Sequence, residues 1–490
     1  MRSDSADVPT KKLVEPILFW GWVALLAWSV IPLGSNRPWA WGFLEAAVFL
    51  HAGAWLIACS LRWVKISEPL RRSWPVLCLL ALWLLYQVVY LLPMPADWIG
   101  RLSPEALNMH RLADALPGAP GWKTLSIDPY AAQVSWLKSL LYVLAFAITL
   151  ALAATRERAR LLAYSIVLAG MVIATYGVLM HVGRESIQWF GEPMVHGPRA
   201  LATFANADHF AGWLEMVLAL GVGLLVADLR DRRVSTWKQL ARHFIEWVLS
   251  PKMRLRLILC VLVIALVATR SRMGNGAFFT SMFIAGIIGI ALSRHATRGT
   301  VILLVSLIVI DTFIVGSWFG VEKLAQRIEQ TSVSKTSSKN EESLEERAKA
   351  ALYAIDLIQD YPAFGAGPGS WYSTYPHYRG ADVMSFYNFA HNDYIQFTAE
   401  SGVIGVSLLA AIVLASLIAA LKAQYQRRDP LMRGLSFAAI MGIIALLMHS
   451  SVDFNLQIPS NAMLFMVILA YAWISLHLDR RPPTQSGGSS

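Results

Sequence analysis

Charged residues are scarce in this chain. Only 15% of its 490 residues are Asp, Glu, Lys or Arg, whereas 56% are hydrophobic, and the mean hydropathy is +0.49. Soluble domains average about 25% charged residues, so the composition argues against an ordinary soluble enzyme. The net charge of +10 would suggest a nucleic-acid partner in a soluble protein. In a membrane protein, basic cytoplasmic loops explain the same excess, and we expect no nucleic acid as partner.

Motifs for metals and nucleotides are also missing from the sequence. There is no HExxH and no CxxC motif. There is no Walker A motif either, because the Gly365–Gly369 turn lacks the Lys-Ser/Thr of a P-loop. Cys59, Cys78 and Cys260 each lie inside an apolar run, as small buried hydrophobic residues do. We therefore expect neither a metal nor a cofactor.

Long apolar runs are present instead. They measure roughly 18–22 residues, about the length at which a helix crosses the hydrocarbon core, and the 19 Trp and 15 Tyr suit the membrane interface. No short cleavable segment precedes the first run, so we expect it to be retained. The sequence predicts an all-α polytopic membrane protein with about twelve transmembrane helices. The predicted spans are 16–33, 39–60, 73–92, 134–154, 161–181, 203–227, 255–268, 274–293, 300–319, 402–421, 431–449 and 460–478.

The basic residues predict an orientation for these spans. If the chain begins in the cytoplasm, every short cytoplasmic segment contains Lys or Arg, as at Arg71–Arg72 and Arg427–Arg428. An even number of spans then places both termini in the cytoplasm. Two long segments, 93–133 and 320–401, lie outside. The predicted division is a membrane domain at 1–319, an outer loop at 320–401, further spans at 402–480 and a tail at 481–490.

Both outer segments contain a predicted helix. The first has a short helical stretch near 104–115. In the second, Ser343 to Glu346 form a capping-box pattern, and apolar residues follow at helical spacing. Pro362 disfavours helix at the preceding residue, so this helix should end near Asp360.

The outer loop also holds a histidine between aromatic and polar residues. His391 precedes Asn392 and Asp393. Imidazole can act as a base near neutral pH, and the two neighbours would orient the ring. A histidine that only bonds a loop carbonyl is the alternative that a single residue leaves open.

Arginines supply candidate anion-binding groups. Arg270 and Arg272 flank Ser271 in a turn predicted to lie outside, where short-loop arginine is disfavoured. Guanidinium groups match phosphate oxygens, and a tight turn can add backbone N–H groups. Arg347 and Arg379 in the outer loop are further candidates. For each of the four, an interfacial or solvated charge is the alternative.

Two histidines at outer ends of spans complete the set. His209 follows Asp208, and His449 precedes Asp453 by four residues. A hydrogen bond that ties helices together is the alternative for both. Together, a base and several guanidinium groups on one membrane face suit a phosphate that is linked to a lipid, since ATP and nucleotide sugars are cytoplasmic. A polyprenyl pyrophosphate glycoside fits, with arginine stabilising the leaving group and His391 accepting a proton from the acceptor hydroxyl.

These motifs resemble those of the O-antigen ligase and O-antigen polymerase superfamily. The resemblance covers roughly residues 200–460, and the SIDP sequence at 126–129 is similar to a subset of the same superfamily. It is carried by FANADHFAGWLEM at 204–216, the Ser271-Arg272 turn, DYPAFGAGPGSW at 360–371, AHNDYIQFTAESGVIG at 390–405 and the stretch from His449 to Asp453.

The resemblance implies a GT-C-like helical fold in the bacterial inner membrane, with a long periplasmic loop. It implies metal-independent transfer of a glycan from undecaprenyl pyrophosphate to an acceptor sugar. His391 matches the family's proposed base, Arg272 matches the arginine that contacts pyrophosphate, and Arg347 and Arg379 correspond to loop arginines. Met273 departs from the Gly or Thr that often follows Ser-Arg, so the local backbone shape can differ.

Several alternatives remain open at this stage. The acceptor can be lipid A core, a second lipid-linked repeat or a protein, since these branches share motifs. A transporter or flippase of lipid-linked sugars is the rival function, and it would carry polar residues near the midplane of several spans. A non-catalytic scaffold or sensor would tolerate substitutions throughout 361–401.

Overall fold

The computed structural model describes residues 8–115, 122–183, 186–190, 192–195, 198–228, 251–292, 344–383 and 387–478. Over this part of the chain the protein is helical apart from one antiparallel hairpin, β1 (Ser186–Trp189) with β2 (Glu192–Val195). Ten of the described helices are long and apolar enough to cross a membrane. The prediction of an all-α polytopic membrane protein is confirmed.

The ten helices agree closely with the predicted spans. Of the other two, the prediction at 255–268 is the helix α11 (Pro251–Ala268), whose start carries Lys252, Arg254 and Arg256, and the prediction at 300–319 lies outside the described residues. The ten are α1 (Val8–Val30), α2 (Pro38–Ser60), α4 (Trp74–Val88), α7 (Pro129–Leu152), α8 (Arg156–Gly183), α9 (Ala207–Ala227), α12 (Arg272–Ala291), α17 (Asp393–Gln426), α18 (Pro430–His449) and α19 (Pro459–His477). Short elements join them: α3 (Glu68–Arg72) and the 3₁₀ turns η1 (Leu33–Ser35), η2 (Val89–Leu91) and η3 (Asn455–Gln457).

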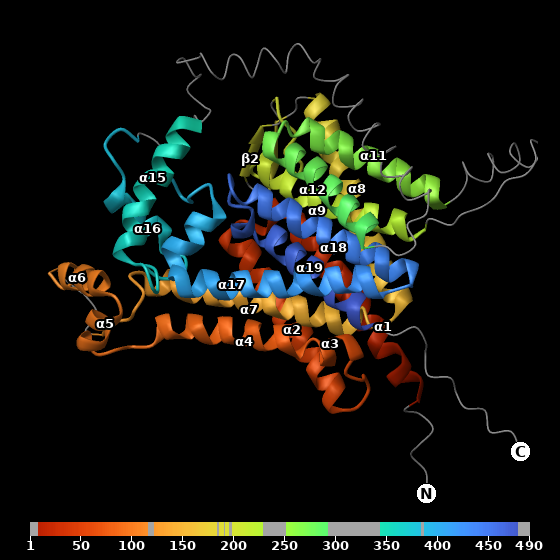
Figure 1. Ribbon diagram of the computed structural model, residues 1–490, viewed down its shortest axis with the longest axis horizontal. Coiled ribbons are helices and arrows are strands. Elements are labelled where there is room, and N and C mark those ends of the chain that lie inside the picture. The colour runs from red at the N-terminus through yellow and green to blue at the C-terminus, as the bar shows by residue number, and fades with distance from the viewer. Residues whose placement is uncertain are drawn as a thin grey trace, which may run out of the picture.

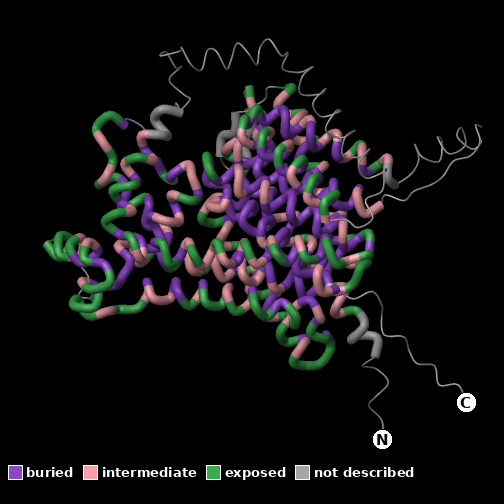
Figure 2. Tube along the Cα trace, in the orientation of Figure 1, coloured by how far each residue is buried: buried purple, intermediate pink, exposed green. Residues whose placement is uncertain are grey.

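Three helices form the centre of the membrane domain. In α9 and α19, 89% of the membrane-spanning stretch is buried, against 28% in α2. The peripheral helices therefore present a side to lipid, and the central ones do not. Figure 2 shows the buried residues concentrated along α9, α18 and α19. Glycines let α9 and α18 approach closely, because a Cβ built on Gly434 would lie 2.2 Å from the carbonyl oxygen of Gly223.

A second, smaller apolar core lies outside the membrane domain. It is formed by α5 (Ala96–Leu102), α6 (Pro104–Ala113), α15 (Leu344–Asp360), α16 (Trp371–Tyr378) and the start of α17. We call α5, α6, α15 and α16 the outer subdomain, and Figure 1 shows them at one end of α4, α7 and α17. The helix α15 ends at Asp360 and α6 lies within 104–115, as predicted from the sequence.

The helix α17 joins the two cores and is kinked at Gly402, where φ is +62°. The predicted span begins at this residue, but the helix itself begins earlier in the chain, at Asp393. The segment after α15 runs along the kink and bonds to it through Ala366 N to Ala399 O and Val403 N to Pro362 O, both 2.9 Å. The hydroxyl of Tyr86 in α4 donates to Ser401 O at 2.6 Å, which ties the kink to the membrane domain.

Candidate functional site

A buried carboxylate lies at the outer end of the central helices. Asp453, in the connection between α18 and α19, is only 2% exposed and faces three imidazoles. Its Oδ1 is 3.7 Å from Nε2 of His209 and 3.8 Å from Nδ1 of His391, and its Oδ2 is 3.9 Å from Nε2 of His449. We call these four residues the Asp453 cluster. The separations exceed hydrogen-bond length, so the contacts are electrostatic.

The charge of Asp453 is stabilised by this surrounding. Burial raises the pKa of its carboxyl group, but His209, His449 and His391 outweigh that effect and hold the pKa below the ordinary value. Asp453 is therefore a buried anion whose neighbours supply compensating positive charge.

His391 lies at the rim of the cluster, with 12% of its side chain exposed. Its φ is +49°, and its ring meets Phe454 edge-on, with centroids 4.7 Å apart. Asn392 caps α17 and donates from Nδ2 to Ser451 O at 2.8 Å. Asp393 accepts from Ser450 Oγ at 2.8 Å. The predicted orienting pair thus fixes the loop to the 450–456 segment, and the carboxylate that faces the ring is Asp453.

A second buried pair extends the cluster inward. The His449 Nδ1 atom lies 2.7 Å from Oε1 of Glu215, and both side chains are at most 1% exposed. Glu215 sits on α9, more than one turn beyond His209. Polar groups at this depth are costly unless they are paired inside the protein, so the pair binds α9 to α18.

The predicted arginine turn begins α12. Ser271 is the N-cap and accepts from Gly274 N at 3.1 Å, while Asn275 Nδ2 donates back to Ser271 O at 2.7 Å. Arg270 has φ +54°, and both Arg270 and Arg272 are exposed. Two cations thus flank the N-terminus of a long helix, a position that favours anions.

A third arginine at this turn was missed from the sequence. The Nε atom of Arg199 donates to Thr269 O at 2.9 Å, and its Nη2 lies 2.5 Å from Asp208 Oδ1. The available signal was an arginine nine residues before an acidic residue, ahead of a polar helix start. That signal does not reveal the carbonyl of Thr269, which directly follows α11, far along the chain.

The arginine turn and the Asp453 cluster both contact the first turns of α9. On one side, a Cβ built on Gly274 would lie 2.6 Å from Cβ of Ala211. On the other side, His209 faces Asp453, and its carbonyl oxygen accepts from Asn461 Nδ2 at 2.9 Å. The start of α9 therefore connects the arginine turn with the Asp453 cluster.

The remaining predicted residues lie on the outer subdomain. Arg379 is the exposed C-cap of α16. Arg347 belongs to α15, and its side chain lies outside the described residues. Neither residue is on an element that carries the Asp453 cluster. Among the described residues, no group of three or more His, Cys, Asp or Glu is arranged to hold a metal ion.

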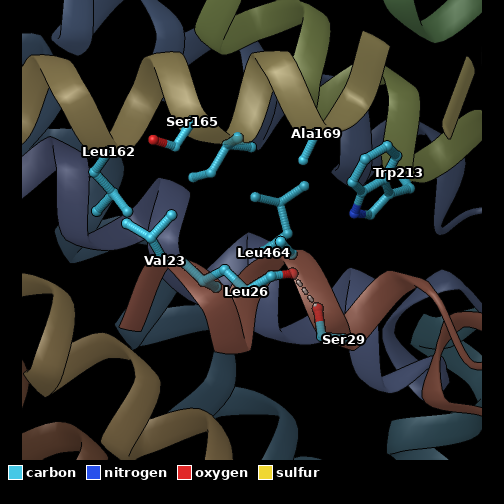
Figure 3. A pocket seen from close by; sticks show the side chains of 10 residues that line it. Val23, Leu26, Ser29, Leu162, Ser165, Ala169, Trp213 and Leu464 are labelled. Carbon is cyan, nitrogen blue, oxygen red and sulfur yellow. Dashed lines mark hydrogen bonds between the residues drawn. The ribbon is translucent and has the colours of Figure 1, made fainter. Parts of the chain in front are cut away.

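A pocket in the membrane domain is mainly apolar. It lies between α1, α8, α9 and α19, and Figure 3 shows Val23, Leu26, Leu162 and Trp213 around it. Its polar side chains are Ser29, which donates to Leu26 O at 2.8 Å, and Ser165. No charged side chain lines this pocket, so it offers no group for acid–base chemistry.

Comparison with known proteins identifies part of the chain. Residues 257–410 match the family model described as O-antigen ligase. This stretch contains the arginine turn, the outer helices α15 and α16, His391 and the kink of α17. No curated protein matches the chain.

Proposed function

The chain belongs to the O-antigen ligase superfamily through residues 257–410, and we propose that it transfers a glycan from undecaprenyl pyrophosphate to an acceptor sugar hydroxyl. The family implies a membrane glycosyltransferase of the ligase or polymerase type. We place the reaction on the periplasmic face of a bacterial inner membrane, with both termini in the cytoplasm. The observation that supports this proposal is the Asp453 cluster, which sets a partly exposed imidazole against a buried anion.

His391 is the proposed base. Its Nδ1 atom faces Asp453, so a neutral ring with its proton on Nδ1 leaves Nε2 to accept a proton from the acceptor. Such an arrangement, in which a buried carboxylate orients the ring of a histidine base, raises the basicity of the other nitrogen. His209, His449 and Asp453 support the base, while Asn392 and Asp393 hold its loop in place.

The arginine turn is the proposed pyrophosphate site. The acceptor oxygen bonds to the anomeric carbon, the bond from that carbon to the pyrophosphate oxygen breaks, and its electron pair leaves with the diphosphate. The acceptor proton goes to His391. Arg272 and Arg270 stabilise the charge that develops on the diphosphate, with Arg199 at the same turn, and Arg347 and Arg379 are candidates to contact the glycan donor from the outer subdomain.

The acceptor is lipid A core or a second lipid-linked repeat, and a protein acceptor is the third branch. A flippase for the same lipids is the rival. The Asp453 cluster comes from helix ends and connecting segments rather than from the middle of several spans, which favours transfer over transport.

Substitution of the base and of the first arginine tests the proposal. His391→Ala is expected to lower glycan transfer by about 10²-fold or more, the usual effect of removing a general base. Arg272→Lys is expected to lower it about tenfold, because lysine cannot form the bidentate fork. The assay supplies one defined undecaprenyl-pyrophosphate glycan with lipid A core and a second lipid-linked repeat side by side, so the product also identifies the acceptor.

Matched controls come from the outer subdomain. His377 on α16 and Arg111 on α6 are both exposed, and His377→Ala and Arg111→Lys are expected to transfer glycan at the wild-type rate. Wild-type transfer by a well-expressed His391→Ala protein would remove His391 as the base, and unchanged donor use by Arg272→Lys would remove Arg272 from the site.

A further inference from the structure

Two imidazoles from different elements face the same oxygen atom of Asp453. His209 approaches Oδ1 from the first turn of α9, and His391 approaches it from the loop before α17. The distances of 3.7 and 3.8 Å are nearly equal. One carboxylate oxygen therefore serves two groups that can each carry a proton.

The third imidazole has an anion of its own. His449 lies 2.7 Å from Glu215, much closer than its 3.9 Å to Asp453 Oδ2. Asp208, next to His209, pairs with Arg199 at 2.5 Å. The Asp393 carboxylate accepts from Ser450 Oγ and Leu456 N. With Glu215, Asp208 and Asp393 paired or hydrogen-bonded elsewhere, Oδ1 of Asp453 faces His209 and His391, while His449 acts on Oδ2.

We propose that His209 is a positioning residue, which competes with His391 for Asp453 and so sets the pH range in which His391 works as a base. The inference rests on the proposed function. A positive charge on His209 compensates Asp453 and weakens the hold of Asp453 on a proton at His391. His391 then stays unprotonated down to a lower pH than it would beside an unshared carboxylate.

Replacing His209 and replacing Asp453 should shift the pH–rate profile in opposite directions. In His209→Asn, the full charge of Asp453 acts on His391, so the acid limb of the pH–rate profile moves up by about one pH unit. In Asp453→Asn, the stabilising anion is lost, so the limb moves down by about the same amount and the plateau rate also falls. A purely structural disturbance would lower the rate without moving the limb in opposite directions.

A second readout does not depend on glycan transfer. Diethyl pyrocarbonate reacts with a histidine when its imidazole is neutral and not when it is protonated, and the extent of modification at His391 can be followed by peptide mass spectrometry across pH. The midpoint of this reaction should move up in His209→Asn and down in Asp453→Asn. His209→Gln serves as a second neutral replacement if the Asn variant does not express.

The control is a histidine remote from the cluster. His51 lies on α2 and stacks near Trp22, with centroids 6.1 Å apart, and His51→Asn should leave both profiles unmoved. Equal midpoints in wild type, His209→Asn and His209→Gln would overturn the inference even if His391→Ala abolished transfer. Conversely, opposite shifts at His391 combined with full transfer by His391→Ala would retain the competition but remove the base from the proposed function.

Discussion

Glycine residues decide where the outer segment can lie against α17. Gly365, Gly367, Gly369 and Gly402 all have positive φ, and their neighbours approach too closely for a side chain. At Gly367, where φ is +118°, a built Cβ would lie 2.1 Å from Ser126 Oγ and 2.9 Å from its Cα. The first outer segment therefore rests on the backbone of the second, as the bond from Ile127 N to Ala366 O at 3.0 Å confirms.

Gly367→Ala is expected to destabilise the protein by more than about 1 kcal/mol, because alanine is strained at this φ and would displace Ser126. Glycan transfer should fall with it, since the same segment leads to His391. The measurement is thermal unfolding in detergent together with the transfer assay. Gly53→Ala on α2 is the control, because a Cβ there meets nothing within 4 Å; equal melting temperatures for the two variants would contradict the prediction.

The sequence indicates the chemistry of single residues better than their partners. Local motifs indicate His391 and Arg272, and the polar stretch at the end of a predicted span indicates the pair of His449 and Asp453. The approach of His209 and His391 to the same carboxylate could not be predicted, because the three residues come from α9, from the loop before α17 and from the connection before α19. Arg199 was missed for the same reason, since its carbonyl partner lies at the end of α11.

At the scale of elements, the outer subdomain is held by buried polar groups as well as by apolar packing. Glu400 on α17 is 5% exposed, and its carboxylate accepts from Gly369 N at 3.0 Å and from Gln396 Nε2 at 2.8 Å. These bonds explain why α17 already begins before the kink, in a stretch that hydropathy assigns to a loop. Hydropathy placed the start of the span at Gly402, and Pro362 indicated the end of α15, but neither signal could reveal a helix whose polar side chains are paired inside a second core.

Tyr375 on α16 makes this subdomain sensitive to high pH. Burial, with a smaller contribution from Tyr387, raises the pKa of its hydroxyl to about 12. A raised pKa means that the neutral form is favoured in the folded state, so the contribution to stability is complete below about pH 10 and is lost as the pH rises through 12. Tyr375→Phe should therefore show a flatter loss of thermal stability between about pH 10 and 12 than wild type.

The check is a pair of experiments on the same samples: melting temperature against pH, and titration of tyrosinate absorbance. Tyr372→Phe is the control, since Tyr372 is 60% exposed on the same helix. If Tyr372→Phe flattened the curve as much as Tyr375→Phe, the effect would belong to alkaline unfolding in general and not to the buried hydroxyl.

At the scale of the whole molecule, the central helices account for the position of the candidate site. The helices α9, α18 and α19 bury most of their surface in the protein, so their ends can hold ionisable groups away from lipid. The Asp453 cluster lies where α9 begins and α18 ends, and the arginine turn lies where α11 ends and α12 begins. Alternating helix directions bring these four ends to one side of the membrane domain, the side that carries the outer subdomain.

This arrangement makes the orientation testable. We predict that the outer subdomain faces the periplasm and that the connection between α17 and α18 faces the cytoplasm. Single cysteines at Tyr372 and Arg428, both exposed, are introduced into a variant that lacks Cys59, Cys78 and Cys260. In intact spheroplasts, a membrane-impermeant maleimide should label Tyr372→Cys and leave Arg428→Cys unlabelled, and lysis should make both reactive. Labelling of Arg428→Cys alone before lysis would show that the protein is inserted in the opposite orientation. The base and the arginines would then face the cytoplasm, where a lipid-linked donor would no longer be required.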